Sequence, residues 1–171
     1  PTSTPDLMPR NRIALCYGTR PQVIKASVLR ARLEAEFPVL AVDTGQHYDY
    51  ELNALLYEQL GVRAPDAILE VGSAGHAEQT AAVLIRAEKV LQEHRPAAAV
   101  VIGDTNSTLG CTLAATKLRI PVVHVEAGLR ADDVLMPEEI NRRVVDAISH
   151  VLCTPSARAT RRVAAERQDA V

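Results

Sequence analysis

The sequence has little that would suit a membrane, a nucleic acid or a metal ion. Its formal net charge is −2, which offers no electrostatic basis for binding nucleic acid or an anionic membrane. No apolar run approaches the roughly 18 residues of a spanning helix, and residues 1–12 lack the apolar core of a signal peptide. Cys16, Cys111 and Cys153 lie far apart in apolar segments, so we expect buried reduced thiols without metal ligation. A cytoplasmic location is expected.

Two common phosphate-binding motifs are also missing. The turn after the first expected strand lacks Gly-x-Gly-x-x-Gly, and no Walker A motif occurs in the chain. Glycines in these motifs let the backbone approach a phosphate closely. Their absence argues against an ordinary dinucleotide enzyme or a P-loop phosphotransferase.

Short apolar segments alternate with helical patterns along the 171 residues, and the hydrophobic content of 47% supports one domain with a core. The patterns predict strands at 12–17, 39–42, 97–102, 121–125 and 150–153, and a short one near 68–71. They predict helices at 22–37, 48–60, 76–94, 109–118, 137–149 and after 156. This alternation requires parallel strands joined by right-handed crossovers. We therefore expect a doubly wound, Rossmann-like α/β domain over residues 12–171, after a flexible lead-in at 1–11.

The turn after the first expected strand carries two cations. Arg20 lies at the turn, and Lys25 lies about one helical turn into a helix that starts near Pro21. A guanidinium, an ammonium and a helix N-terminus together can bind an anion. The alternative is that both are solvated surface cations.

The next two turns at strand ends carry polar side chains as well. Gln46 and His47 follow the second strand, where His47 could bind a phosphate or simply cap the next helix. Asp104 follows the strand 97–102, ahead of three residues that make good N-caps. Ligands of open parallel sheets bind in the crevice at the carboxyl ends of the strands. Asp104 therefore either caps its helix or faces a ligand.

The last of these turns, with the helix after it, is the richest in polar side chains. These are His124, Glu126, Arg130, Glu138, Glu139, Asn141 and Arg142. A Glu at a helix start usually complements the dipole, as Glu139 alone would. Because Glu126 ends the preceding strand, a carboxylate cluster is expected, and crowded carboxylates acquire raised pKa values that suit general acid–base work. Beside an anion site, this predicts proton abstraction from a sugar that has a phosphate leaving group.

Five motifs at these strand ends resemble those of the UDP-N-acetylglucosamine 2-epimerase family. They are Gly18-Thr19-Arg20-Pro21-x-x-Ile24-Lys25, Thr44-Gly45-Gln46-His47, Gly103-Asp104-Thr105-Asn106-Ser107-Thr108, His124-Val125-Glu126-Ala127-Gly128-Leu129-Arg130, and Pro137-Glu138-Glu139-x-Asn141-Arg142. The resemblance covers nearly all of residues 12–160. It implies the N-terminal half of a glycosyltransferase-B-like fold, in which two Rossmann-like domains close on a nucleotide sugar.

The resemblance also implies a mechanism without cofactor or metal. The C2 proton is removed while UDP leaves C1 in an anti elimination, and UDP adds back to the 2-acetamidoglucal after protonation from the opposite face. Asp104, Glu126 and Glu138 match the family's catalytic carboxylates. The residues that match its substrate-binding positions are Arg20, Lys25, Gln46, His47, Arg130, Asn141 and Arg142. Gln22 and Ser27 stand where the family usually has Glu and Pro.

Family members are about twice as long as this chain, and their second domain carries most of the nucleotide contacts. The resemblance therefore implies a partner, either a C-terminal half or a separate chain, and an assembled enzyme that could form a homo-oligomer. Residues 46 and 47 match a region that holds an activating nucleotide sugar in some bacterial members, but Asp49 departs from their pattern, so activation is not expected. The alternatives are a hydrolysing epimerase that releases N-acetylmannosamine and UDP, an enzyme for another UDP-2-acetamido sugar, and a non-catalytic regulatory partner of an epimerase.

Overall fold

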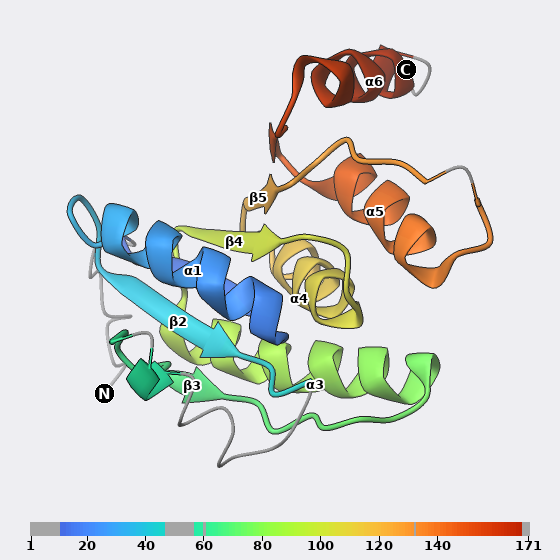
Figure 1. Ribbon diagram of the computed structural model, residues 1–171. Helices are drawn as coiled ribbons and strands as arrows, with labels where there is room; N and C mark the ends of the chain where they lie inside the picture. The colour runs from blue at the N-terminus through green and yellow to red at the C-terminus, as the bar shows by residue number, and fades with distance from the viewer. Residues whose placement is uncertain (1–10, 47–56, 60, 132, 169–171) are drawn as a thin grey trace, which may run out of the picture.

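Six parallel strands form one sheet, in the order β3-β2-β1-β4-β5-β6. The computed structural model describes residues 11–46, 57–59, 61–131 and 133–168 (Figure 1). The strands are β1 Ile13–Tyr17, β2 Val39–Asp43, β3 Ala67–Ile68, β4 Ala98–Ile102, β5 Val122–Val125 and β6 Val151–Cys153. The helices are α1 Arg20–Leu33, α3 His76–His94, α4 Asn106–Lys117, α5 Pro137–Ile148 and α6 Ala157–Gln168.

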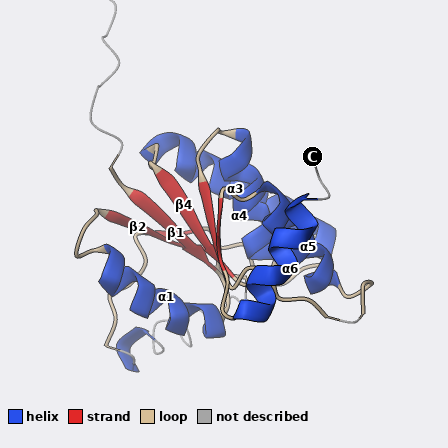
Figure 2. Ribbon diagram, turned by 90° about the horizontal axis from the view of Figure 1, so that it is seen from above, coloured by secondary structure: helices blue, strands red, loops and turns tan. Residues whose placement is uncertain are grey.

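The central strands are apolar throughout because helices cover both faces of the sheet. Figure 2 shows α1 on one side of the strands and α3 and α4 on the other. Alternate side chains of β1 illustrate the two cores: Cys16 packs in the cluster with α3 and α4, whereas Leu15 and Tyr17 pack in the cluster with α1. The doubly wound, Rossmann-like fold expected from the sequence is confirmed.

The strand order changes direction beside β1, whose neighbours are β2 and β4. At this point the turns after the three strands meet very closely. A Cβ atom on Gly18 would lie 1.9 Å from Thr44 Oγ1 and 2.3 Å from Ser107 Oγ. Only glycine fits there, so the turn after β1 packs against the turn after β2 and the first residues of α4. This is the crevice in which open α/β sheets bind ligands.

Most predicted elements are present with shifted ends, and the helix 76–94 has the expected bounds. The fourth helix begins at Asn106 rather than 109 because Thr105 caps it, its side chain accepting a hydrogen bond from the Thr108 backbone N–H. The lead-in and the helix expected at 48–60 lie mostly outside the described residues. Cys153 is exposed, not buried as predicted, because β6 is an edge strand. None of the helices in the described ranges is both long and apolar enough to cross a membrane.

Candidate active site

The polar residues predicted as a site gather at the carboxyl edge of β1, β4 and β5, where two pairs of opposite charge form. The first joins α1 to the end of β5. Lys25 Nζ donates hydrogen bonds to both oxygens of Glu126, at 2.7 and 2.9 Å. The two side chains retain 45% and 28% of their exposed surface, so solvent reaches the pair. Arg20, on the first turn of α1, is exposed and makes no ion pair with any described residue.

The second pair joins the turn after β4 to α5. Arg142 donates to Asp104 Oδ2 through Nε at 2.8 Å and Nη2 at 2.6 Å. Asn141 Nδ2 donates to the Asp104 backbone carbonyl at 2.9 Å. Burial acts to lower the pKa of Arg142, but its hydrogen bonds to Asp104 and Glu139 raise that pKa above its usual value. The guanidinium therefore stays charged beside Asp104.

Each of these carboxylates faces a cation, in place of the carboxylate crowding expected from the sequence. Glu126 contacts Lys25 and Asp104 contacts Arg142. Each carboxylate is therefore oriented by its own cation.

Glu126 has a backbone conformation that is uncommon for a residue with a side chain. Its φ is +72°, in the left-handed region that costs most residues about 1 kcal/mol. Its backbone N–H donates to the Cys153 carbonyl of β6 at 3.1 Å. Gly103 lies opposite, and a Cβ atom there would come within 3.3 Å of Glu126 Oε2. The neighbouring turn thus leaves room for this carboxylate, as expected where strain serves a site.

The two glutamates at the start of α5 differ sharply. Glu138 is half-buried and makes no ion pair with the described residues. Glu139 is fully buried and accepts hydrogen bonds from the Ala131 backbone N–H at 2.9 Å, Arg142 Nη1 at 3.1 Å and Arg143 Nε at 2.9 Å. Burial acts to raise the pKa of Glu139, but these hydrogen bonds lower it below its usual value. Glu139 is thus ionised and holds the two arginines, whereas the Glu138 carboxylate has no cation partner among the described residues.

Arg130 is largely buried, although the sequence placed it among the substrate-binding residues. Its side chain is 3% exposed, and Nη1 donates to Asp146 Oδ2 at 2.7 Å. It also forms a two-pronged ion pair with Glu166 of α6 and lies 3.9 Å from Glu139 Oε1. These contacts tie the loop after β5 to α5 and α6. Contact with substrate stays a prediction.

His124 and Asp146 form a buried pair below the turns. His124 Nδ1 lies 2.6 Å from Asp146 Oδ1, and His124 Nε2 lies 2.7 Å from the Gly103 carbonyl oxygen. The sequence analysis did not single out Asp146. It is seven residues after Glu139 on α5, which puts both carboxylates on the same buried helix face. A carboxylate on the apolar side of a helix signals a buried partner, and this spacing could have revealed it.

Two glutamines join the turns to one another. Gln22 Oε1 accepts from the Gly18 backbone N–H at 2.8 Å, while Nε2 donates to the Ile102 carbonyl at 2.6 Å. Gln46 Oε1 accepts from Ser107 Oγ at 2.7 Å, so the structure places it between β2 and α4. His47 lies outside the described residues.

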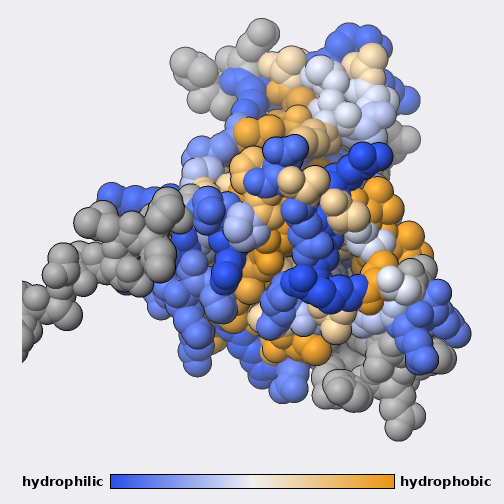
Figure 3. All heavy atoms as spheres, turned by 90° about the vertical axis from the view of Figure 1, so that its left-hand side faces the viewer, coloured by the Kyte–Doolittle hydropathy of each residue, from blue (hydrophilic) through white to orange (hydrophobic). Residues whose placement is uncertain are grey.

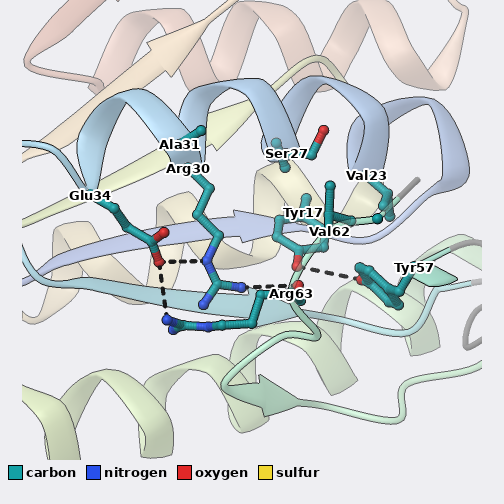
Figure 4. A pocket seen from close by; sticks show the side chains of 11 residues that line it. Tyr17, Val23, Ser27, Arg30, Ala31, Glu34, Tyr57, Val62 and Arg63 are labelled. Carbon is teal, nitrogen blue, oxygen red and sulfur yellow. Dashed lines mark hydrogen bonds and ion pairs between the residues drawn. The ribbon is translucent and has the colours of Figure 1, made fainter. Parts of the chain in front are cut away.

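A separate cavity of about 200 Å³ lies between α1 and residues 57 and 61–63 (Figure 4). The charged Arg30 beneath it is already paired with Glu34 and Asp66. Burial raises the pKa of Tyr17 to about 12, and the Tyr57 hydroxyl donates to Asp43 Oδ2 at 2.7 Å. These groups satisfy one another. None of the candidate carboxylates Asp104, Glu126 and Glu138 is among the residues that line this cavity.

No group of three or more His, Cys, Asp or Glu side chains that could hold a metal ion is found among the residues the structure describes. Exposed apolar side chains precede α5, the helix that carries Glu138 in its first turn. Leu135 is 82% exposed and Val134 58%, just before α5. On the face shown in Figure 3, apolar surface is likewise interspersed with hydrophilic residues.

Known proteins match this chain in both sequence and structure. The solved structure of the Methanocaldococcus jannaschii UDP-GlcNAc 2-epimerase in complex with UDP-GlcNAc and UDP is 43% identical, with a TM-score of 0.84 over 91% of this chain and 43% of that chain. A UDP-N-acetylglucosamine 2-epimerase homolog of Methanococcus maripaludis is 41% identical over 85% of this chain and 41% of the relative. A Pseudomonas aeruginosa UDP-2,3-diacetamido-2,3-dideoxy-D-glucuronate 2-epimerase is 42% identical over 85% of this chain and 42% of its own length.

The chain thus spans about two fifths of the length of the relatives it matches. The matching family model is described as UDP-N-acetylglucosamine 2-epimerase and covers residues 30–171. This chain belongs to that family.

Proposed function

We propose that this chain carries the catalytic carboxylates of a non-hydrolysing UDP-GlcNAc 2-epimerase, which interconverts UDP-GlcNAc and UDP-N-acetylmannosamine. The observation that supports this most directly is the convergence of two carboxylates on one crevice, each beside a cation, from segments far apart in sequence. Lys25 and Glu126 are 101 positions apart, and Asp104 and Arg142 are 38 apart. A purely structural role would not require both pairs at the ligand-binding edge of the sheet.

In the proposed reaction, one carboxylate takes the proton from C2 while the C1–O bond to UDP breaks on the opposite side. The electron pair of the C2–H bond forms the C1–C2 double bond of a 2-acetamidoglucal. A carboxylic acid on the other face then returns a proton to C2, and UDP re-forms the bond at C1. Inversion needs groups on both faces of the sugar, and Asp104, Glu126 and Glu138 are the candidates.

The leaving diphosphate is anionic and needs cations near the start of a helix. Arg20 and Lys25 lie in the first two turns of α1, where the helix dipole adds positive potential. Arg20 has no carboxylate partner among the described residues, so its charge is available to a phosphate. Gln46, His47, Arg130, Asn141 and Arg142 complete the proposed substrate-binding set, in which Asn141 and Arg142 act by holding Asp104.

A complementary domain or chain is part of this proposal. The relatives are more than twice as long as the match, and the exposed Val134 and Leu135 beside Glu138 suit a surface that another unit covers. The assembled enzyme, rather than this chain alone, would then bind UDP-sugar tightly and turn it over.

Two alternatives share the early steps. In a hydrolysing enzyme, water would capture the intermediate and release N-acetylmannosamine and UDP. The substrate could also be another UDP-2-acetamido sugar, since the Pseudomonas relative, named for such a substrate, is as similar as those named for UDP-GlcNAc. A non-catalytic regulatory partner would not need intact acid–base groups.

The test combines this chain with its complementary half and supplies UDP-GlcNAc in deuterium oxide. Deuterium should enter C2, and UDP-N-acetylmannosamine should form without release of free sugar. Asp104→Asn and Glu126→Gln should each abolish exchange, while Glu93→Gln, an exposed carboxylate on α3, should leave it unchanged. Free N-acetylmannosamine as the first product would favour the hydrolysing enzyme. Exchange that survives both carboxylate substitutions would refute the catalytic assignment.

A further inference from the structure

A closed ring of contacts, made by charged side chains and the Gly103 backbone carbonyl, begins and ends at the turn after β4. On one side, Arg142 joins Asp104 to the buried Glu139, donating to Asp104 Oδ2 and, at 3.1 Å, to Glu139 Oε2. Glu139 Oε1 then lies 3.9 Å from Arg130 Nε. This half of the ring holds the side chain of Asp104.

The other half returns to the same turn through the core. Arg130 Nη1 donates to Asp146 Oδ2, which also accepts from the Gly128 backbone N–H at 3.0 Å. Asp146 Oδ1 lies 2.6 Å from His124 Nδ1, and His124 Nε2 lies 2.7 Å from the Gly103 carbonyl oxygen. This half holds the backbone next to Asp104.

The number of protons in this half follows from its donors and acceptors. A backbone carbonyl only accepts hydrogen bonds, so His124 Nε2 must carry the hydrogen that it shares with Gly103. An ionised Asp146 likewise only accepts, so Nδ1 must carry a hydrogen too. Burial acts to raise the pKa of Asp146, but its hydrogen bonds to His124 and Arg130 lower it below its usual value. Both ring nitrogens are therefore donors.

We propose that His124 carries a hydrogen on both ring nitrogens in the folded protein and is a positioning residue for Asp104. It fixes the Gly103 carbonyl while Arg142 fixes Asp104 Oδ2, so two consecutive residues are each held by a cation. Asp104 Oδ1 makes no hydrogen bond to any described residue and is left free to meet a ligand. The importance of orienting Asp104 rests on the proposed function, but the charge state and its effect on the turn do not.

Facing an ionised Asp146, a neutral imidazole could keep only one of the two contacts. It carries a single hydrogen, so it would release either Gly103 or Asp146. Asp146 is the carboxylate that faces the ring, from α5, and Arg130 acts on the ring through Asp146. Because His124 is fully buried, no water could replace the lost partner without disturbing the fold.

The first experiment measures protonation directly, in this chain labelled with ¹⁵N at histidine. At pH 8 an ordinary histidine, with a pKa near 6.5, is neutral, with one ring nitrogen bare. His124 should instead show two protonated ring nitrogens with slowly exchanging hydrogens. His124→Gln identifies the signals by their loss, and Asp146→Asn should convert the ring to the neutral form. A bare ring nitrogen on His124 at pH 8 would overturn the proposal.

The second experiment tests positioning in the same chain by backbone NMR relaxation of residues 103–105. His124→Gln should loosen the amide of Asp104 and shift the Arg142 Nε–H signal. The matched control His150→Gln removes an exposed ring whose Nδ1 accepts only from the Val122 backbone N–H at 3.2 Å, and it should leave this turn unchanged. A folded His124→Gln protein with an equally ordered turn would refute the positioning role, whatever its activity.

Discussion

Asp104 and Glu126 end neighbouring strands and each contacts one cation, yet their surroundings differ. Within the described ranges, Glu126 forms an ion pair only with Lys25, whose side chain is 45% exposed. Asp104 meets Arg142, which is 17% exposed and is itself tied to the fully buried Glu139. The Lys25–Glu126 pair can separate and be solvated at little cost in free energy, whereas the Arg142–Asp104 pair belongs to a ring that includes buried charges. In the proposed enzyme, Asp104 would keep its position when substrate binds, whereas Glu126 would leave Lys25 and contact the substrate.

The largest contrast should come from removing a buried member of the ring. Asp146→Ala leaves His124 and Arg130 without their shared counter-charge, which should lower the free energy of unfolding by about 3–5 kcal/mol. Glu126→Ala, the matched change at the exposed pair, should cost less than about 1 kcal/mol. Urea denaturation followed by circular dichroism measures both. Equal losses of unfolding free energy in the two variants would show that the ring stabilises the fold no more than the exposed pair does.

The glycine between the two carboxylates should show a smaller effect. Gly103 has φ +71°, and an added Cβ would lie 3.3 Å from Glu126 Oε2 and 3.5 Å from Gln22 Nε2. Gly103→Ala should therefore cost about 1–2 kcal/mol of unfolding free energy. Gly75→Ala is the control, since its φ is −61° and nothing lies within 4 Å of the added atom. If Gly103→Ala left the unfolding free energy unchanged, the turn at Gly103 could move away from Glu126 and Gln22 without cost.

Acid should destabilise the protein by protonating the carboxylates of the ring. The pKa values of Glu139 and Asp146 are lowered in the folded protein. Their contribution to stability is therefore complete above the unfolded pKa values, near 4, and is lost as pH falls through the folded values. Thermal unfolding between pH 7 and pH 2 should show this loss, and Glu139→Gln should make it shallower. If Glu139→Gln lost as much stability between pH 7 and pH 2 as the parent protein, Glu139 would not contribute to the acid sensitivity.

Salt should have the smallest effect, and it should act on the exposed pair. Lys25→Met should change the unfolding free energy by less than about 1 kcal/mol at low ionic strength. The difference between this variant and the parent protein should vanish at 1 M salt, where screening acts within about 3 Å. Arg142→Met should keep most of its cost at that salt concentration. If both variants respond alike to salt, the two pairs do not differ in burial as described.

The fold and the placement of polar side chains at the strand ends were largely predictable from the sequence, because both depend on local patterns. Apolar runs marked the strands, and polar residues after each run fall at one edge of a parallel sheet. The ring was not predictable in this way, since all but one of its contacts join residues 9 to 38 positions apart, from Glu139–Arg130 to Asp104–Arg142. Asp146 has no local pattern that names His124 as its partner, and the burial of Arg130 depends on Glu166 of α6. The helix predicted at 109–118 begins instead at Asn106, because the Thr105 side chain caps it there.

The left-handed backbone at Glu126 has a consequence for evolution and protein engineering. At φ +72° glycine or asparagine would have less backbone strain than glutamate, so stability alone does not explain a glutamate there. A library screened only for thermal resistance should drift toward Glu126→Gly and lose the carboxylate, whereas a screen for turnover should retain it. The residue found at position 126 would then show whether a variant was selected for thermal stability or for turnover.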